Sequence, residues 1–417
     1  MNPTKGNRTM PRVQHSVFRT LYRPPEGVNV KVPYSFLGAP YGEEELNAVR
    51  RVMESGWLTT GMETHLFEED WREAHGVEYA YTASNCTTAL HMAAQLCKLQ
   101  PGDEVVTTPI TFISTNQAVL AQGAVPVFVD VDPRTFNIAP DAIRAAITPK
   151  TKALFVTHVA GQMCDMDEIM AIAEEHGLLV VEDCAHTQGA SYKGKAAGSF
   201  GDVGCFSFHA IKNMTTLGEG GMLTTNRDDF AVKIPWLRSM GSRYPGDPHD
   251  DGTPGPRPYG VDDVDGYIPS NLRMTEAQAA VGREQLKKLP AFIERRRQIA
   301  HRYSGALADL PGVTVPYESP DAVHTYHIYA LLIDSDLTGK TNHELYDVLM
   351  NEHGVHTVPG LYRPSYLFDL YAKKGFVASC PTAEWSAANS LQLPLYPHLT
   401  DEQIDHVIAS VRSALGR

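Results

Sequence analysis

The feature that most constrains the fold is a regular alternation of short apolar segments with longer amphipathic ones. Residues 153–158 and 178–181 are two such apolar segments, each short enough to be a strand buried on both faces. Between them, residues 165–177 place apolar side chains at helical spacing, namely Met166, Ile169, Met170 and Ala173. Strands joined by helices in this way pair mostly in parallel, with right-handed crossovers. We therefore predict an α/β fold.

A single lysine, Lys212, lies between an apolar, aromatic strand and a glycine-rich turn in residues 205–221. A partly desolvated lysine amine loses its proton near neutral pH and can attack a carbonyl to form a Schiff base. Ser207, at the end of the predicted strand, offers a hydroxyl to a phosphate. For a lone lysine, a surface position in a tight turn is the simpler explanation, so a second signal is needed.

That second signal is Asp183, which follows the apolar strand at 178–181. The carboxyl ends of strands in open α/β sheets are where ligands bind. An aspartate there can keep a pyridine nitrogen protonated, which makes pyridoxal phosphate (PLP) an electron sink. A strand-end aspartate is more often a turn or helix cap. Asp183 and Lys212 together are the specific signal.

Two motifs carry a resemblance to a known family. Glu-Asp-x-Ala at 182–185 and Phe-Ser-Phe-His-x-x-Lys-Asn-x-Thr-Thr with Gly-Glu-Gly-Gly at 206–221 resemble the DegT/DnrJ/EryC1/StrS family. That family consists of PLP-dependent aminotransferases of the aspartate-aminotransferase fold type I, acting on keto-sugars and keto-cyclitols. The resemblance runs from about residue 38 to the C-terminus. It implies a large domain at 34–288 with a mostly parallel seven-stranded sheet, a smaller α+β domain at 289–417, and an N-terminal arm at 1–33.

The resemblance also implies a set of site residues. The catalytic pair is Lys212 and Asp183, and both are expected to bind the cofactor. Six further residues are expected around PLP: Cys86 and Thr87 at a helix N-terminus that binds the phosphate, Phe112 stacked on the ring, His186 near the ring hydroxyl, Ser207 on the phosphate, and Asn271 reaching the phosphate of a neighbouring subunit. Arg273 is a weaker candidate beside Asn271, and the shared site implies a homodimer.

Expected substrate contacts are Trp57, Leu58, His209 and His327. Packing explains Trp57 equally well, and a packed strand histidine in residues 324–330 explains His327 equally well. The chain departs from the family pattern at Met62, Cys86 and Leu217, and a side chain at position 86 could crowd the phosphate.

Composition excludes other classes. The formal net charge of −13 argues against a nucleic-acid-binding surface and gives no support to an anionic-membrane role. The six cysteines have no metal-ligand spacing, so we expect reduced, mostly buried thiols and no metal site. No apolar run is long enough to span a bilayer, and residues 1–33 lack the apolar core of a secretory signal. We expect a cytoplasmic protein.

The run of arginines at 295–297 is interpreted as a solvated helix face.

These features predict transfer of an amino group from glutamate or glutamine to a ketone of a nucleotide-linked keto-sugar, in amino-sugar biosynthesis for an antibiotic or polysaccharide. A keto-cyclitol or aminoshikimate-type substrate is the alternative, as for scyllo-inosose aminotransferases or 3-amino-5-hydroxybenzoate synthases, which share a segment like 158–163. Dehydratase relatives carry histidine in place of Lys212. A non-catalytic regulator is disfavoured by the intact pair, and a nicotinamide oxidoreductase by the absence of Gly-x-Gly-x-x-Gly after a strand.

Overall fold

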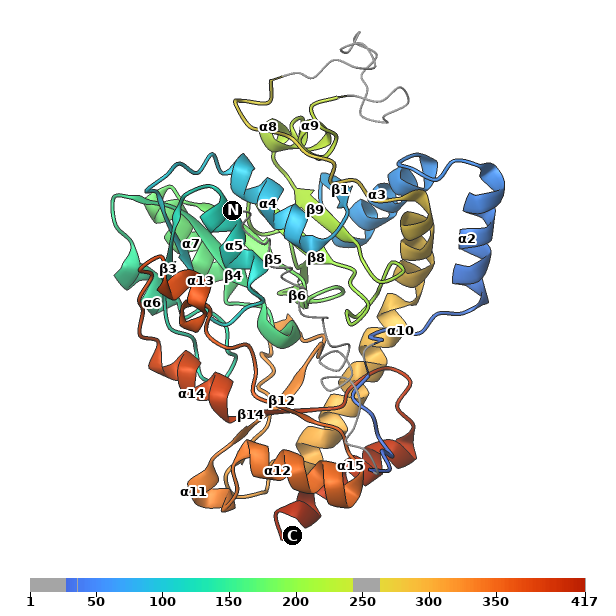
Figure 1. The fold of residues 1–417 in the computed structure, drawn as a ribbon, viewed down its shortest axis with the longest axis vertical. Helices are drawn as coiled ribbons and strands as arrows, with labels where there is room; N and C mark the ends of the chain where they lie inside the picture. Colours follow the sequence, from blue (N-terminus) through green and yellow to red (C-terminus); the bar gives the residue numbers. More distant parts are fainter. Residues whose placement is uncertain (1–27, 36, 243–262, 417) are drawn as a thin grey trace, which may run out of the picture.

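The computed structural model describes residues 28–35, 37–242 and 263–416. Most of the expected N-terminal arm at 1–33 and of a Pro- and Gly-rich stretch at 244–265 lies outside these residues. The chain forms a larger part around a central sheet and a smaller part below it, with helix α10 (Glu276–Leu307) extending from one to the other (Figure 1). The predicted domain boundary at residue 288 falls inside α10.

The prediction of a mostly parallel seven-stranded sheet is confirmed. Only β9 runs antiparallel to its neighbours, and the remaining paired strands run in one direction. The strand order is β1 (Tyr79–Ala83), β9 (Gly221–Thr225), β8 (Val203–Ser207), β5 (Leu179–Asp183), β4 (Thr151–Thr157), β2 (Glu104–Thr107) and β3 (Val125–Phe128).

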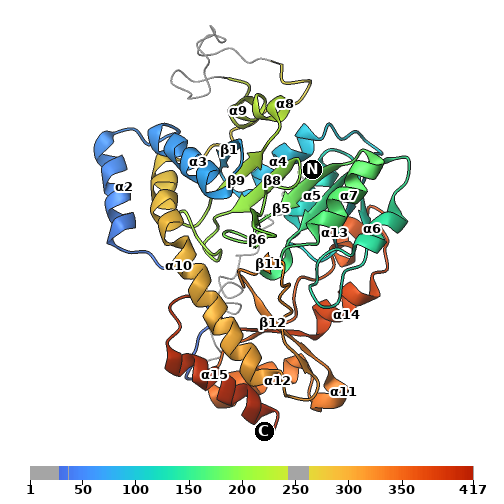
Figure 2. The same ribbon diagram turned by 180° about the vertical axis from the view of Figure 1, so that it is seen from behind.

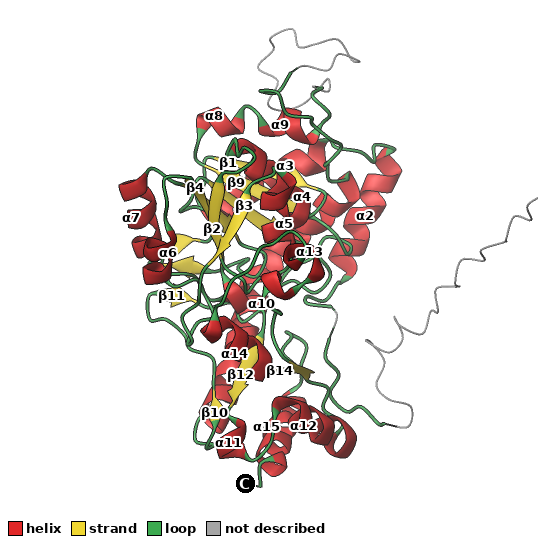
Figure 3. Ribbon diagram, turned by 60° about the vertical axis from the view of Figure 1, so that its left-hand side comes forward, coloured by secondary structure: helices red, strands yellow, loops and turns green. Residues whose placement is uncertain are grey.

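Helices cover both faces of this sheet (Figure 3). One core packs beneath α3 (Met62–His75) and α7 (Met166–His176), and the other beneath α4 (Cys86–Leu96) and α5 (Ser114–Ala121). Successive strand residues point to opposite faces, so Val180 enters the first core and Val181 the second. The same alternation places the side chains of Glu182 and Asp183 on opposite faces of the sheet.

Helix α7 shows how the local sequence sets an element. Asp165 caps its first turn by accepting the Glu168 N–H, and Gly177 ends it in the left-handed conformation with φ 63°. Of the apolar residues predicted to face inward, Met166, Ile169 and Ala173 are buried, and Met170 is half-buried. This helix then feeds the chain directly into β5.

The smaller part is built on a sheet of four short strands: β10 (Val313–Thr314), β12 (Tyr329–Ile333), β14 (Ser390–Leu393) and β13 (Val358–Pro359). The main helices around it are α12 (Asn342–Val348), α14 (Pro381–Asn389) and α15 (Asp401–Ala414). The strand expected at 324–330 begins only at Tyr329, because the N–H groups of Thr325 and Ile328 donate instead to the turn at 160–161 of the large part. His327 therefore lies in a connecting segment between the two parts.

Seen from the opposite side, α10 runs from beside α2 (Glu43–Ser55) and α3 to α15 (Figure 2). Among the residues described, no helix combines the length and apolarity needed to cross a membrane.

The arginine run on α10 is only partly a solvated face, so that prediction was wrong for one residue. Arg296 is 1% exposed and donates to three backbone carbonyls, those of Gly38 (2.8 Å), Tyr326 (3.2 Å) and Leu395 (3.1 Å). Burial lowers the pKa of its guanidinium to about 10. Arg296 thus joins the N-terminal segment to the small part, whereas its neighbour Arg295 pairs with Asp401 at the surface.

We predict that Arg296→Met lowers the free energy of unfolding by about 2–4 kcal/mol, since three buried carbonyls lose their donor. The matched control, Arg295→Met, removes a surface ion pair and one bond to the Leu399 carbonyl, and should cost about 1 kcal/mol. Urea titration of the two variants checks this. Equal losses would contradict the tying role of Arg296.

Candidate active site

Lys212 lies in the turn that follows β8. It is 7% exposed, and its backbone N–H donates to the His209 carbonyl at 2.9 Å. The N-terminal segment packs tightly against this turn, because Gly38 donates to the Ala210 carbonyl at 2.8 Å. A Cβ at position 38 would stand 2.0 Å from the Lys212 carbonyl oxygen, so only glycine fits there. Burial lowers the pKa of Lys212 to about 8, although Asp183 acts in the opposite direction.

Asp183 ends β5 and is buried beneath α4 and α5. Its Oδ1 accepts the Ala185 N–H at 3.1 Å, and its Oδ2 accepts the Thr115 hydroxyl at 2.5 Å. Burial raises the pKa of Asp183, while these hydrogen bonds and the charge of Lys212 favour the carboxylate. The site therefore pairs a deeply placed acid with an amine that is easily deprotonated.

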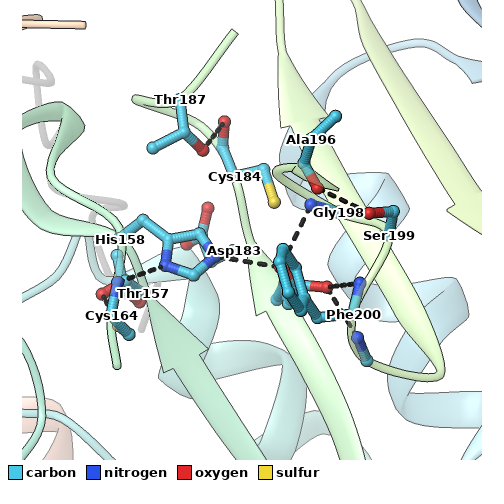
Figure 4. A network of polar contacts seen from close by, with 12 residues as sticks. Thr157, His158, Cys164, Asp183, Cys184, Thr187, Ala196, Gly198, Ser199 and Phe200 are labelled. Atoms are coloured by element: carbon cyan, nitrogen blue, oxygen red, sulfur yellow. Dashed lines mark hydrogen bonds and ion pairs between the residues drawn. The ribbon is translucent and has the colours of Figure 1, made fainter. Parts of the chain in front are cut away.

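Glu182, on the other face of β5, anchors this strand end, and Figure 4 draws three of the residues that it contacts: His158, Gly198 and Phe200. Its carboxylate accepts the N–H groups of Gly198 (3.0 Å), Phe200 (2.9 Å) and Gly201 (2.7 Å). It also lies 3.0 Å from Nε2 of His158, whose Nδ1 accepts the Cys164 N–H. The Nδ1 bond leaves Nε2 to carry the proton, so His158 donates to Glu182. Together with Cys184, these side chains have metal-ligand chemistry, but hydrogen bonds already engage the carboxylate and the imidazole.

The predicted phosphate-binding turn begins α4. Asn85 caps the helix and accepts the Thr88 N–H at 2.9 Å, so the amides of Cys86 and Thr87 remain at the end where intrahelical partners are lacking. A Cβ at Gly221 would stand 2.5 Å from the Asn85 carbonyl carbon, so β9 packs closely against this turn. The Cys86 thiol contacts Asp183 Oδ1 (3.9 Å) and the Cys205 carbonyl (3.6 Å), which places it at the floor of the site.

Three aromatic side chains form a stack beside the lysine. The rings of His186 and His327 lie 4.4 Å apart, and Tyr362 Oη is 3.0 Å from His186 Nε2. Burial, followed by the charge of Lys212, holds the pKa of both histidines well below the usual value, so both rings are neutral. His186 and His327 each retain a buried Nδ1 without a hydrogen-bond partner among the described residues.

The structure brings most of the predicted cofactor residues together but not all of the predicted site. Phe112 is 55% exposed and precedes α5, where its carbonyl accepts from Thr115. Ser207 is buried at the end of β8, and its Oγ accepts the His209 N–H at 3.3 Å. The remaining candidates lie away from the buried pair. His209 is half-buried, its carbonyl accepts the Lys212 N–H, and its ring lies near Glu219. Trp57 and Leu58, on the loop between α2 and α3, and Asn271, bridged to Ser239, are exposed.

Sequence reasoning missed three residues that shape the site, Gly38, Thr115 and Tyr362, whereas Gln188 belongs to the strand-end motif that follows β5. Gln188 donates to the carbonyls of Ala185 (3.1 Å) and Ser207, linking the two strand ends. Thr115 and Tyr362 reach the site from segments far away in the sequence. No local pattern marks any of the three missed residues, because each acts through a contact that only the fold creates.

These residues fit PLP on their own chemistry. An aldehyde needs a buried amine with a lowered pKa, which is Lys212, and a ring nitrogen needs a nearby carboxylate, which is Asp183. A phosphate needs a helix N-terminus, which is that of α4. The partnerless Nδ1 of His186 is a polar atom available to a ring hydroxyl.

Comparison with known proteins agrees with this geometry. The model of the DegT/DnrJ/EryC1/StrS aminotransferase family matches residues 40–412, so the chain belongs to that family. The spore coat polysaccharide biosynthesis protein SpsC of Bacillus subtilis is 39% identical over 391 residues, covering 91% of this chain and 96% of SpsC.

Solved structures give the same result. The aminotransferase from Psychrobacter cryohalolentis matches with a TM-score of 0.85 and 34% identity, covering 92% of this chain and 99% of its own. NtdA from Bacillus subtilis, solved with bound cofactor PMP, matches with a TM-score of 0.80 and 28% identity, covering 90% of this chain and 82% of its own. The protein is a PLP-dependent aminotransferase of fold type I, from a family of sugar aminotransferases.

We predict that covalent capture of PLP by the apoprotein accelerates with pH up to about 8 and then levels off. The neutral amine is the nucleophile, so below the pKa of Lys212 the rate constant should rise about tenfold per pH unit. Stopped-flow absorbance measures it, and Lys212→Ala should show no capture. A rate that keeps rising to pH 10 would contradict a buried, low-pKa lysine.

Proposed function

We propose that this enzyme transfers an amino group from glutamate or glutamine to a ketone of a nucleotide-linked keto-sugar. The observation that carries the proposal is the burial of Lys212 beside Asp183, with the pKa of the lysine lowered to about 8. The sugar class is supported by the likeness to SpsC, whose name assigns it to polysaccharide biosynthesis.

When bound, PLP supplies an aldehyde and a ring that accepts the electron pair released as a proton leaves the carbon beside the amine. In our proposal Lys212 holds the aldehyde and, once released, moves that proton between carbon atoms as general base and acid. Its pKa near 8 suits both roles at neutral pH. Asp183 keeps the ring nitrogen protonated, and this demands that its own carboxylate stay ionised although buried.

The remaining residues orient the cofactor. The amides of Cys86 and Thr87, with the Ser207 hydroxyl, receive the phosphate at the positive end of α4. Phe112 would cover the ring with an apolar face, and His186, held by Tyr362, would meet the ring hydroxyl. Neutral histidines suit this place because they add no charge that would compete with Asp183.

A keto-cyclitol substrate is the alternative, but the segment whose resemblance favours it has a structural role. The segment 158–163, which resembles that of 3-amino-5-hydroxybenzoate synthases, is buried. His158 is held by Glu182 and Cys164, and Gln162 contacts Met163 and Ser319. These contacts support the sheet, so likeness in this segment reports on packing and says little about substrate.

The amino-donor half-reaction is tested by absorbance. We expect wild-type protein with PLP to show a Schiff-base band that glutamate or glutamine converts to the pyridoxamine spectrum, and Lys212→Ala to show neither. Lys195→Ala, which changes the exposed first residue of β7 (Lys195–Ala196), is the matched control and should behave as wild type. The aminated enzyme is then offered keto-sugar nucleotides and keto-cyclitols. Turnover of the cyclitols alone would overturn the sugar assignment.

We further propose a homodimer in which Asn271 serves the site of the partner subunit. Asn271 is exposed, although the segment that carries it is fixed, since the Leu272 carbonyl accepts the Ser84 N–H at 2.8 Å. Large apolar side chains are exposed along α2 and the loop and helix that follow it: Met53 (68%), Trp57 (59%), Leu58 (55%) and Met62 (66%). Such a surface is expected where a second copy covers it.

Mixing two inactive variants tests this arrangement. Lys212→Ala lacks the amine, and Asn271→Asp places a negative charge against the phosphate. Co-expressed heterodimers contain one site free of both changes, so random pairing should restore about 25% of wild-type activity. If each site used its own Asn271, no activity would return. The separate variants and the tandem variant carrying both changes in one chain are the controls.

A further inference from the structure

A line of buried hydroxyl groups leads to Asp183 from the neighbouring strands. Thr157 ends β4, Thr111 follows β2, and Thr115 lies in the first turn of α5. Their oxygens are 3.1 Å apart between Thr157 and Thr111, and 2.8 Å apart between Thr111 and Thr115. Thr115 Oγ1 is 2.5 Å from Asp183 Oδ2. All four residues are at most 3% exposed, so water does not compete for these bonds.

The direction of every bond in this line follows from counting protons. An ionised carboxylate can only accept, so Thr115 donates its single hydroxyl proton to Asp183 at 2.5 Å in preference to the neutral Phe112 carbonyl at 3.2 Å. Thr115 therefore accepts from Thr111, whose proton is then used, and Thr111 accepts from Thr157. Bonds aligned in one direction polarise one another, and the last one, to a charged acceptor, is the strongest. The line therefore stabilises the carboxylate form of Asp183.

We propose that Thr115 is a positioning residue for transamination, holding Asp183 ionised and oriented toward the ring nitrogen, with Thr111 and Thr157 fixing its hydroxyl. The inference rests on the role of Asp183 in the proposed function. The other donors to Asp183 are the Ala185 amide and the weakly donating Cys86 thiol, both on Oδ1. Thr115 is the only donor on Oδ2 among the described residues.

The location of Thr115 also explains why one segment has two roles. Thr115 donates its backbone N–H to the Phe112 carbonyl at 3.3 Å, within a single turn of chain. The turn that places the Phe112 ring at the surface thus also places the Thr115 hydroxyl against Asp183. The titratable groups close enough to Asp183 to interact with it electrostatically include Lys212, His158 and Tyr362, and the cysteines Cys86, Cys184 and Cys205. Of these, the charge of Lys212 favours the ionised form of Asp183, and it does not replace a hydrogen bond on Oδ2.

The test compares Thr115→Val, which keeps the shape and removes the hydroxyl, with Thr115→Ser, which keeps the hydroxyl. In Thr115→Val we expect the kcat of the glutamate half-reaction to fall 10- to 100-fold with little change in KM. The ring nitrogen should lose part of its proton, so the pKa of the lysine–PLP Schiff base, read by absorbance, should rise by about one unit. Thr115→Ser should restore both values to near those of the wild type.

A series along the line separates this role from general packing. Thr111→Val should give a smaller shift of the Schiff-base pKa than Thr115→Val, and Thr157→Val the smallest, because each is one bond further from Asp183. Equal values in Thr115→Val and wild type would overturn the proposal, as would equal impairment in Thr115→Val and Thr115→Ser. Neither readout uses the ketone, so a wrong sugar assignment would leave both results unchanged.

Discussion

Two adjacent carboxylates at the end of β5 are buried, and the rest of the structure depends on how each is satisfied. Because strand residues alternate between faces, Glu182 points to one side of the sheet and Asp183 to the other. Glu182 collects three backbone amides and His158, which fixes the strand end. Asp183 has fewer donors and keeps capacity for a ligand. Glu182 therefore fixes the end of the strand, and this fixed strand end holds Asp183 in position.

Asp183 and Lys212 are buried ionisable groups, and the protein leaves part of their electrostatic stabilisation to the cofactor. Burial alone would neutralise both Asp183 and Lys212, since it raises the pKa of the acid and lowers that of the amine. Their mutual attraction and the hydroxyl of Thr115 oppose this for the acid. A cationic ring nitrogen adds a further favourable partner. The neutral histidines nearby keep that balance undisturbed.

Much of this arrangement could be predicted from the sequence. The α/β alternation, the strand-end Asp183 and the turn with Lys212 are local patterns, and the structure places them on the expected elements. Arg296 was mistaken for a solvated residue because neighbouring side chains on a helix point in different directions. The sequence of three consecutive arginines does not show which of these side chains faces inward. Thr115 and Tyr362 gave no signal, since their roles arise from contacts between distant segments. Leu58 and Asn271 are exposed on this chain, and their predicted roles rest on the proposed homodimer.

The measurement that tests the account most directly is chemical mapping of the lysine that holds the cofactor. Protein saturated with PLP is reduced with borohydride, digested and analysed by peptide mass spectrometry. We predict one reduced pyridoxyl group per chain, on the peptide that contains Lys212, because this lysine combines deep burial with a pKa near 8. A label spread over surface lysines, or fixed at another single lysine, would contradict it.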